Sequence, residues 1–381
     1  MSWGKVSLGE VADVNWGDTS VTKASYVVQG EIAFSATGGD GFLPYADYDR
    51  DGIVLSAIGA QCGKTWYVSG KWSCIKNTIR FWSTTNFLDN RYLYWATAEQ
   101  SFWPKRGAAQ PFITIGDARA TKIPLPPIDE QRWIAAILDQ ADALRCARRR
   151  TLDCLNDLGP AIFHEMFGPA RISANRVTEI GDRLDFLTSG SRGWAKHYAE
   201  SGSLFLRIQN VGYDELRLDD IAYVTPPETA EAKRTKVEAG DVLLSITADL
   251  GRTAVIPGEL AEAYINQHLA ILRSKHFNPR FLSAALASPI ARQSIERRNK
   301  GGVKAGLNFE DVRSLVVPDV KREAQDEFDR RVQAVDRLKL AARLSAGASE
   351  RLFISLQHLA FSGELTKEAA AIEMRKLARR A

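Results

Sequence analysis

The residues with the potential for chemistry in this 381-residue chain lie in short glycine-rich stretches that also carry lysine or arginine. Residues 59–65 read GAQCGKT and look like a phosphate-binding loop, but three residues separate Gly59 from Gly63 where that motif needs four. A similar later stretch, residues 248–253 (ADLGRT), lacks both the lysine and the first glycine. We therefore predict a turn between strands at each place, and not a nucleotide site.

Other patterns that support catalysis do not stand out. The five histidines have no metal-ligand spacing, and we interpret His164 and His358 as packing residues on helices. We find no Ser/His/Asp arrangement, no nuclease-like carboxylate cluster and no Asn-Pro-Pro-Tyr-like motif for amino-methyl transfer. Residues 35–41 (SATGGDG) lack dinucleotide spacing, so we expect a loop there. The sequence predicts a non-catalytic chain that carries no cofactor and no metal.

Composition indicates a globular protein of two or three domains. Hydrophobic residues make up 45% and charged residues 25%, and the net charge is +4. No apolar run approaches the roughly 20 residues that a membrane span requires, and the start of the chain lacks the apolar segment of a secretory signal. Four cysteines without C-x-x-C spacing are too few for a disulfide framework. We therefore expect reduced thiols and a cytoplasmic location.

The chain contains an internal repeat. Asp142 and Asp336 are 194 residues apart, and the same offset relates Gln131 to Gln325 within similar segments. Upstream, IVLSAIGAQCGKTWYVSG resembles VLLSITADLGRTAVIPG, whereas the first parts of the two copies differ more. A period near 190 residues is far too long for a solenoid and indicates a duplicated unit. Each unit would consist of a globular domain followed by a helix.

Each copy ends in a segment with the pattern of a long amphipathic helix. Apolar residues recur at spacings of three and four from Ile134 to Met166, and again from Phe328 to Leu359. A helix from Asp129 to about Phe167 spans roughly 55 Å, and Asp129 after two prolines is predicted as its N-cap. Two matched helices separated by a domain favour antiparallel pairing, with the two globular domains at opposite ends of the pair.

The globular parts are predicted to be α+β. Short β-branched runs punctuated by glycine indicate strands, with helices expected within residues 90–103 and 278–298. The predicted fold is two strand-rich recognition domains separated by two long helices that pair as an antiparallel coiled coil. The predicted limits are 1–127 for the first domain, 128–168 for the first helix, 169–318 for the second domain, 319–363 for the second helix and 364–381 for a tail.

Both globular parts carry a basic, glycine-rich loop just before a D-[AV]-R element. The first reads FWPKRGAAQPFITIGD and the second RRNKGGVKAGLNFED. Glycine permits close backbone approach, and Lys and Arg bind phosphate groups or guanine. A single charged loop is usually a solvated surface, but corresponding loops in both copies favour binding of duplex DNA. The predicted DNA-binding residues are Lys64, Lys105, Arg106, Gln110, Arg252, Arg297, Arg298, Lys300 and Lys304.

The repeated segments give the chain a family resemblance over nearly its whole length. IPLPPIDEQRWIAAILDQADAL closely resembles a motif of the specificity subunits of type I restriction–modification systems, and LVVPDVKREAQDEFDRRVQAVDRL is a degenerate second copy. The resemblance implies that each domain reads one half of a bipartite DNA target and that the helices set the unread spacer. It also implies two methyltransferase subunits, which bring S-adenosylmethionine, and a restriction subunit as partners.

Two other interpretations remain open from the sequence. In the first, the chain is an assembly scaffold whose two heads bind proteins, and its basic loops are incidental surface charge. In the second, the GAQCGKT stretch supports ATP hydrolysis through Lys64. Loss of nucleotide binding in a Lys64→Ala variant would support this second interpretation.

Overall fold

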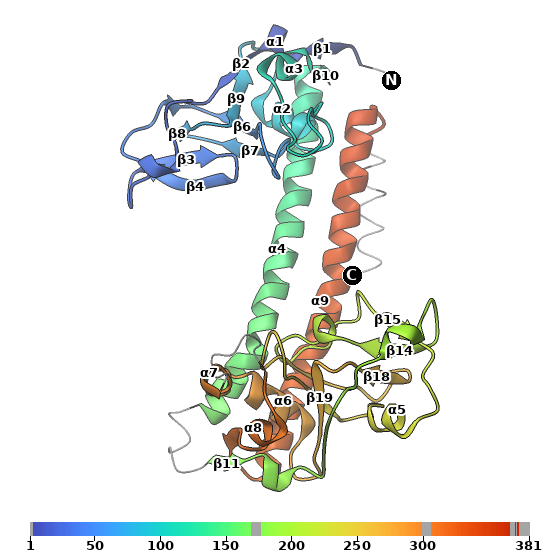
Figure 1. Cartoon of the computed structure of the whole chain (residues 1–381). Coiled ribbons are helices and arrows are strands. Elements are labelled where there is room, and N and C mark those ends of the chain that lie inside the picture. Colours follow the sequence, from blue (N-terminus) through green and yellow to red (C-terminus); the bar gives the residue numbers. More distant parts are fainter. Residues whose placement is uncertain (1–2, 169–176, 299–305, 366–369, 371, 373–381) are drawn as a thin grey trace. The chain divides into compact units, whose positions relative to one another are not determined.

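The computed structural model describes residues 3–168, 177–298 and 306–365, together with Ala370 and Ile372. The chain forms two compact units: unit 1 comprises residues 1–150 and 342–381, and unit 2 comprises residues 151–341. Each unit contains one globular head and a part of each of two long helices (Figure 1). We call residues 3–127 head 1 and residues 177–318 head 2.

Head 1 is built from two four-stranded sheets, a two-stranded ribbon and short helices. The sheets have the strand orders β2-β9-β6-β7 and β4-β3-β8-β5, and β1 pairs with β10. The elements are β1 (Lys5–Ser7), α1 (Leu8–Val11), β2 (Ala12–Trp16), η1 (Lys23–Ser25), β3 (Glu31–Ser35), β4 (Gly38–Leu43), β5 (Tyr48–Asp49), β6 (Gly52–Ser56), β7 (Thr65–Val68), β8 (Lys71–Cys74), β9 (Thr78–Ser83), α2 (Asn90–Thr97), α3 (Ile115–Ala120) and β10 (Lys122–Pro124).

Head 2 repeats the first sheet and the ribbon, but its second sheet has the edge strand β13 beside β15, whereas in head 1 the edge strand β5 lies beside β8. Its sheets have the orders β12-β19-β16-β17 and β13-β15-β14-β18, and β11 pairs with β20. The elements are β11 (Val177–Glu179), η2 (Gly181–Arg183), β12 (Phe186–Ser189), η3 (Trp194–His197), β13 (Tyr198–Ala199), β14 (Ser203–Leu206), η4 (Ile208–Asn210), β15 (Ala222–Val224), α5 (Ala230–Arg234), β16 (Val242–Ser245), β17 (Thr253–Val255), β18 (Ala263–Ile265), β19 (Leu269–Arg273), α6 (Pro279–Ala287), α7 (Pro289–Arg298), α8 (Phe309–Arg313) and β20 (Val316–Pro318).

The predicted α+β class and the internal repeat are confirmed by the matching first sheets, β2-β9-β6-β7 and β12-β19-β16-β17, and by the matching ribbons. Residues 278–298, which the sequence suggested as one helix, form two helices, because Ser288 has an extended backbone (ψ 150°) and Pro289 follows it. Proline lacks the N–H that a continuous helix needs, so the chain turns there and starts α7.

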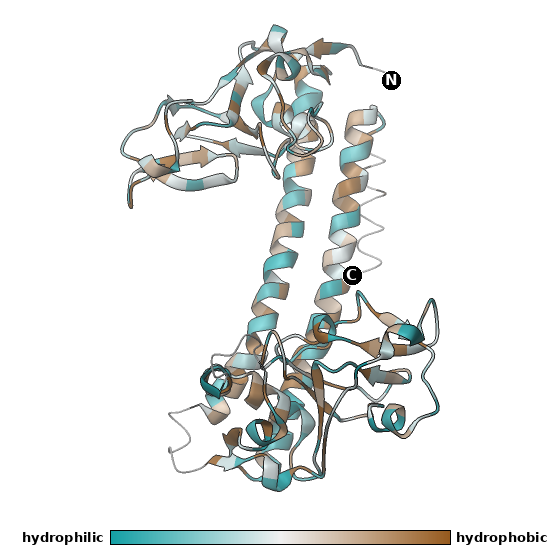
Figure 2. Cartoon of the chain, in the orientation of Figure 1, coloured by the Kyte–Doolittle hydropathy of each residue, from teal (hydrophilic) through white to brown (hydrophobic). Residues whose placement is uncertain are grey.

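The two long helices are α4 (Ile128–Phe167) and α9 (Arg322–Ser362). Hydrophobic and hydrophilic residues alternate along both (Figure 2). In unit 1 the early part of α4 packs against the late part of α9: Leu138 and Leu356 are fully buried in one cluster, and Nη1 of Arg145 lies 3.1 Å from Oε1 of Glu350.

In unit 2 the late part of α4 meets the early part of α9. The ring centroids of Phe163 and Phe167 lie 5.6 Å and 5.9 Å from that of Phe328. Because early residues of one helix contact late residues of the other in unit 1, and the reverse holds in unit 2, the helices pair in antiparallel fashion, as the sequence predicted.

The start of α4 differs from the sequence prediction. Asp129 is not the N-cap, because the helix already includes Ile128, and the carbonyl of Pro127 accepts from the N–H groups of Glu130 and Gln131 at 3.0 Å. Pro127 therefore occupies the N-cap position, and its carbonyl accepts the first hydrogen bonds of the helix. Asp129 and Glu130 lie in the first turn, where carboxylates stabilise the positive end of the helix dipole. The second long helix begins at Arg322.

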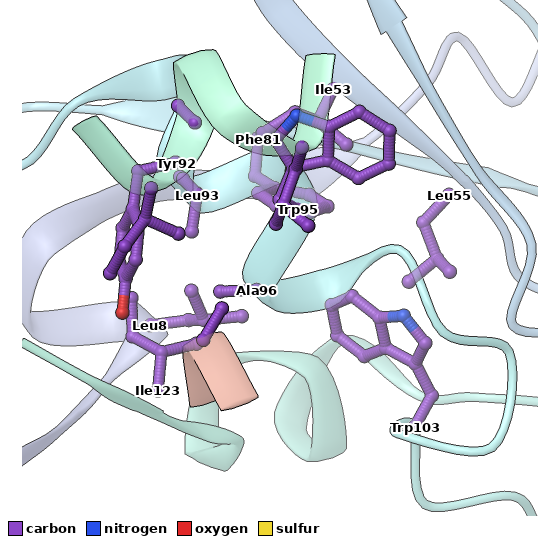
Figure 3. Close-up of a cluster of buried hydrophobic side chains, with 14 of the residues drawn as sticks. Leu8, Ile53, Leu55, Phe81, Tyr92, Leu93, Trp95, Ala96, Trp103 and Ile123 are labelled. Carbon is purple, nitrogen blue, oxygen red and sulfur yellow. The ribbon is translucent and has the colours of Figure 1, made fainter. Parts of the chain in front are cut away.

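The main core of unit 1 joins the head to both long helices. Figure 3 shows Leu8, Tyr92, Trp95 and Ile123 within this cluster, which also contains residues of α4 and α9. The other face of the β2-β9-β6-β7 sheet packs through Val54 and Trp82 against the second sheet of the head. In head 1 the β2-β9-β6-β7 sheet therefore lies between the core shared with the long helices and the β4-β3-β8-β5 sheet.

Leu356→Ala should destabilise the chain by about 2–5 kcal/mol, because its buried side chain fills the contact between α9, α4 and head 1. Leu344→Ala, on the same helix but with 63% of its side chain exposed, should change stability by no more than about 0.5 kcal/mol. Denaturant unfolding of the full chain measures both. Equal losses in the two variants would contradict the packing described.

Candidate nucleic-acid interface

In head 1 the predicted basic loop docks on the GAQCGKT turn. Arg106 and Phe112 exchange two backbone hydrogen bonds of 2.9 Å, which close the loop. The N–H of Gly59 donates to the carbonyl of Pro111 at 2.9 Å, and the N–H of Ile113 donates to that of Ala57 at 2.8 Å. Two segments that lie about 40 residues apart in the chain therefore form one surface.

The side chain of Lys105 lies against Gly63, the residue before Lys64. A Cβ atom added to Gly63 would lie 2.9 Å from Cε of Lys105, and Gly63 has φ +90°, so only glycine fits there. Both lysines are exposed, and neither forms an ion pair within the described part of the chain. The Lys64 ammonium lies 5.5 Å from the ring centroid of Trp66. These two cations are therefore available to a ligand.

Arg106 has a different environment. Its Nε and Nη2 donate to the two carboxylate oxygens of Asp117 at 2.8 Å and 2.7 Å, although 62% of its side chain is exposed. These bonds, followed by those from Thr114, lower the pKa of Asp117 to about 2. Arg106 thus fastens the loop to α3. Gln110 is exposed in the same loop.

In head 2 the residues that follow the basic part of the predicted loop make equivalent contacts. The N–H of Leu307 donates to the carbonyl of Ile246 at 2.8 Å, and Thr247 forms a bridge with Gly306. Gly306 and Leu307 lie 194 residues after Phe112 and Ile113, so the sequence offset is also a structural equivalence. Lys300 and Lys304, which were predicted to bind DNA, lie outside the described residues.

The three predicted arginines of head 2 differ in how far hydrogen bonds within the protein hold their side chains. Arg252 donates to Oδ2 of Asp249 at 2.7 Å and to the carbonyl of Val211 at 3.3 Å, which fixes it within its turn. Arg298 donates to the carbonyl of Ser314 at 2.9 Å and so joins α7 to the segment after α8. Arg297 is exposed at the end of α7 and has no ion pair among the residues that the structure describes.

Sequence reasoning missed a stack of arginine and aromatic side chains in head 1. The guanidinium carbons of Arg50 and Arg80 lie 4.5 Å and 4.1 Å from the ring centroid of Trp82. Nη1 of Arg80 also lies 2.7 Å from Oδ2 of Asp13, while its buried Nε has no hydrogen-bond partner among the described residues. Alternation along β9 places Arg80 and Trp82 on one face, so the strand pattern contained this signal.

Within the described ranges, no group of three or more His, Cys, Asp or Glu side chains is placed to hold a metal ion. No described helix is long and apolar enough to cross a membrane.

Residues 1–151 match the type I restriction modification DNA specificity domain. The MjaVIII specificity subunit of a type I restriction enzyme from Methanocaldococcus jannaschii is 20% identical over 370 residues, covering 86% of this chain and 87% of that protein. The EcoBI specificity subunit of Escherichia coli is 23% identical, covering 65% of this chain and 59% of that protein. Residues 1–151 therefore carry a type I restriction modification DNA specificity domain, and the chain as a whole is similar to specificity subunits of type I restriction–modification systems.

Solved structures show the same fold. The S subunit of a type I restriction–modification system from M. genitalium superimposes with a TM-score of 0.61 at 15% identity, covering 95% of this chain and 96% of that chain. A chain from a study of complex assembly in a type I R-M system gives a TM-score of 0.55 at 20% identity, with coverage of 96% and 98%. At these identities the likeness concerns the fold alone.

The Asp117 carboxyl should titrate near pH 2 and should move up towards the ordinary aspartate pKa of about 3.9 in Arg106→Gln. The pKa of Asp117 is lower in the folded state than in the unfolded state. The Arg106–Asp117 pair therefore stabilises the loop fully at pH values above the ordinary aspartate pKa, and this stabilisation is lost as the pH falls through about 2. Carbon NMR of the carboxyl group measures this. A midpoint that is the same in both proteins would show that Arg106 does not hold the loop.

Proposed function

We propose that this chain is a non-catalytic reader of duplex DNA, in which each head reads one half of a bipartite target. The observation that supports this most is the docked basic loop of head 1, together with equivalent backbone contacts of Gly306 and Leu307, which follow the basic part of the corresponding loop in head 2. In head 1 the loop places Lys105 against the turn that carries Lys64, and neither lysine has an acidic partner in the described residues. Such cations suit phosphate contacts, which position a protein on a duplex.

The nine predicted residues have two roles within this proposal. Lys64, Lys105 and Arg297 contact DNA directly, and Gln110 lies on the same loop as Lys105. Arg106, Arg252 and Arg298 have partners inside the protein and shape the binding surface, and Arg106 also has an exposed guanidinium to share with a phosphate. Lys300 and Lys304 belong to the equivalent loop of head 2 and remain predicted DNA contacts.

The long helices set the unread spacer in this proposal. With 40 and 41 residues, α4 and α9 would each span about 60 Å. Half-sites one turn of DNA apart lie about 34–36 Å from each other, which helices of this length accommodate with heads docked along them. The helices also dock two methyltransferase subunits, which supply S-adenosylmethionine, and restriction subunits join them in the cytoplasm. The chain itself needs no cofactor.

A second candidate function is an assembly scaffold whose heads bind proteins. One observation favours it: Arg106, Arg252 and Arg298 all have hydrogen-bond partners within the chain. The bases of a DNA target would then be read elsewhere in the complex. DNA binding by this chain, and the dependence of that binding on salt, distinguishes the two functions.

Reversing the charge of Lys64 and Lys105 to glutamate should weaken duplex binding and reduce the magnitude of the salt slope by about 2, at roughly 0.9 per lost phosphate contact. Lys122→Glu, an exposed lysine on β10 of the same head, is the matched control and should leave the slope unchanged. Fluorescence anisotropy over a range of salt concentrations measures the slope. An unaltered slope in the double variant would favour the scaffold.

Adding four residues to α4 at Thr151 and four to α9 at Ala342 should lengthen the preferred spacer by about 6 Å, or about two base pairs, while both half-sites stay the same. The paired insertion preserves the contact between the helices on either side of it. Binding to a panel of duplexes with different spacers measures the change. A changed half-site with an unchanged spacer would contradict the assigned role of the helices.

A further inference from the structure

Each unit contains one buried glutamine on a long helix that hydrogen-bonds to the head. Gln131 on α4 is fully buried and Gln325 on α9 is 2% exposed. The two residues lie 194 positions apart, so they are equivalents in the repeat. Buried amides are costly unless all their groups are paired, so the partners of these side chains show what the glutamines hold.

Gln131 connects three parts of unit 1. Its Oε1 accepts from the N–H of Asp89, which is the N-cap residue of α2, at 2.9 Å. Its Nε2 donates to the carbonyl of Phe87 at 2.9 Å and to that of Pro126 at 2.8 Å. The side chain thus joins the first helical turns of α4 to the start of α2 and to the proline turn between them.

Gln325 makes the equivalent contacts in unit 2. Its Oε1 accepts from the N–H of Asn278, the N-cap residue of α6, at 2.8 Å. Its Nε2 donates to the carbonyl of Val320, in the segment before α9, at 3.0 Å. The head helix and the long helix are therefore joined through the same two kinds of group in both units.

An arginine adds a second contact in each unit, two residues after the N-cap. In unit 1, Arg91 Nε donates to Oδ1 of Asp139 at 2.7 Å, and Trp95 Nε1 donates to the same oxygen at 2.8 Å. In unit 2, Arg280 pairs with Asp329 at 3.3 Å and with Asp336 at 2.5 Å. These pairs are partly exposed, whereas the glutamines are buried.

The glutamine hydrogen bonds and the arginine–carboxylate pairs constrain the heads in a different way from the apolar core. Apolar side chains tolerate small shifts, because many packings bury similar area. A buried amide has one arrangement that satisfies its donor and acceptor groups, and any slip of the head leaves them unpaired. The orientation of each head on its helix is thus specified at these points.

We propose that Gln131 and Gln325 are positioning residues that fix the orientation of each head on its long helix and thereby the spacing at which that head reads DNA. This proposal rests on the proposed function. Gln131 acts on head 1 and Gln325 on head 2, so the two heads are oriented independently. A head released from its glutamine stays attached through the apolar core but samples several orientations.

Spin labels at Lys71→Cys in head 1 and Ala143→Cys on α4, both exposed positions of unit 1, report the orientation of head 1 by electron–electron distance measurement. Cys146 and Cys154 are replaced by serine in all variants, while Cys62 and Cys74 are buried. Gln131→Ala should broaden or shift the distance distribution. Gln131→Glu, which places a carboxylate oxygen against the carbonyls of Phe87 and Pro126, is the second variant and should broaden it at least as much.

Two control variants separate positioning from general destabilisation. Gln140→Ala removes an exposed glutamine from the same helix and should leave the distance distribution unchanged. Ile134→Ala opens the buried core beside head 1 and lowers stability without touching the hydrogen bonds of Gln131. An unchanged distribution in folded Gln131→Ala, or equal broadening in Ile134→Ala, overturns the proposal.

A second measurement uses duplexes that carry the target with the preferred spacer or with one base pair more or fewer. Gln131→Ala and Gln325→Ala should each lose part of the discrimination between these spacers, about tenfold for each 1.4 kcal/mol of positioning energy. Broadened distances with full discrimination overturn the proposal. If the wild-type chain shows no sequence preference at all, the proposed function is wrong. The distance measurement then tests by itself whether the glutamines orient the heads.

Discussion

The structure of each unit depends on the contact between α4 and α9. In unit 1, residues of both helices, including Leu138 and Leu356, share one apolar cluster with Tyr92 and Trp95 of head 1. In unit 2, Phe163 and Phe328 join the helices to the core of head 2. Neither head packs on a single helix, so separating the helices would expose the base of both heads. The antiparallel pairing is therefore a structural requirement of the heads as well as a link between them.

Hydrogen bonds and an ion pair favour one orientation of head 1 on its helix, which the apolar packing alone specifies less sharply. The buried amide of Gln131, the proline carbonyl at the start of α4 and the Arg91–Asp139 pair all lie where head 1 meets its helix. Hydrogen bonds of this kind contribute modest net stability but are costly to leave unmade, so they favour one arrangement over its neighbours. The basic loop is part of head 1, so its direction follows the orientation of that head. Backbone hydrogen bonds between Arg106 and Phe112 close the loop.

Much of this fold was predictable because the chain contains an internal sequence repeat, so each half could be compared with the other. The offset of 194 residues, the helical periodicity and the glycine-punctuated strands indicated two α+β heads and two paired helices. Local capping was less predictable: Asp129 has the right residue type for an N-cap, but Pro127 occupies that position. For the candidate site, sequence identified the basic residues but not their partners. The partners of Arg106 and Arg298 lie 11 and 16 residues away, and only folding brings them together.

The central proposal is that this chain directs adenine methylation to a bipartite DNA sequence through its two heads. Single-molecule sequencing of methylated adenines in cells with and without this gene tests it most directly. The account predicts one methylated motif, with two defined halves around an unread spacer, that disappears when the gene is removed. An identical set of methylated motifs in both cells, with the methyltransferase partners expressed, would contradict it.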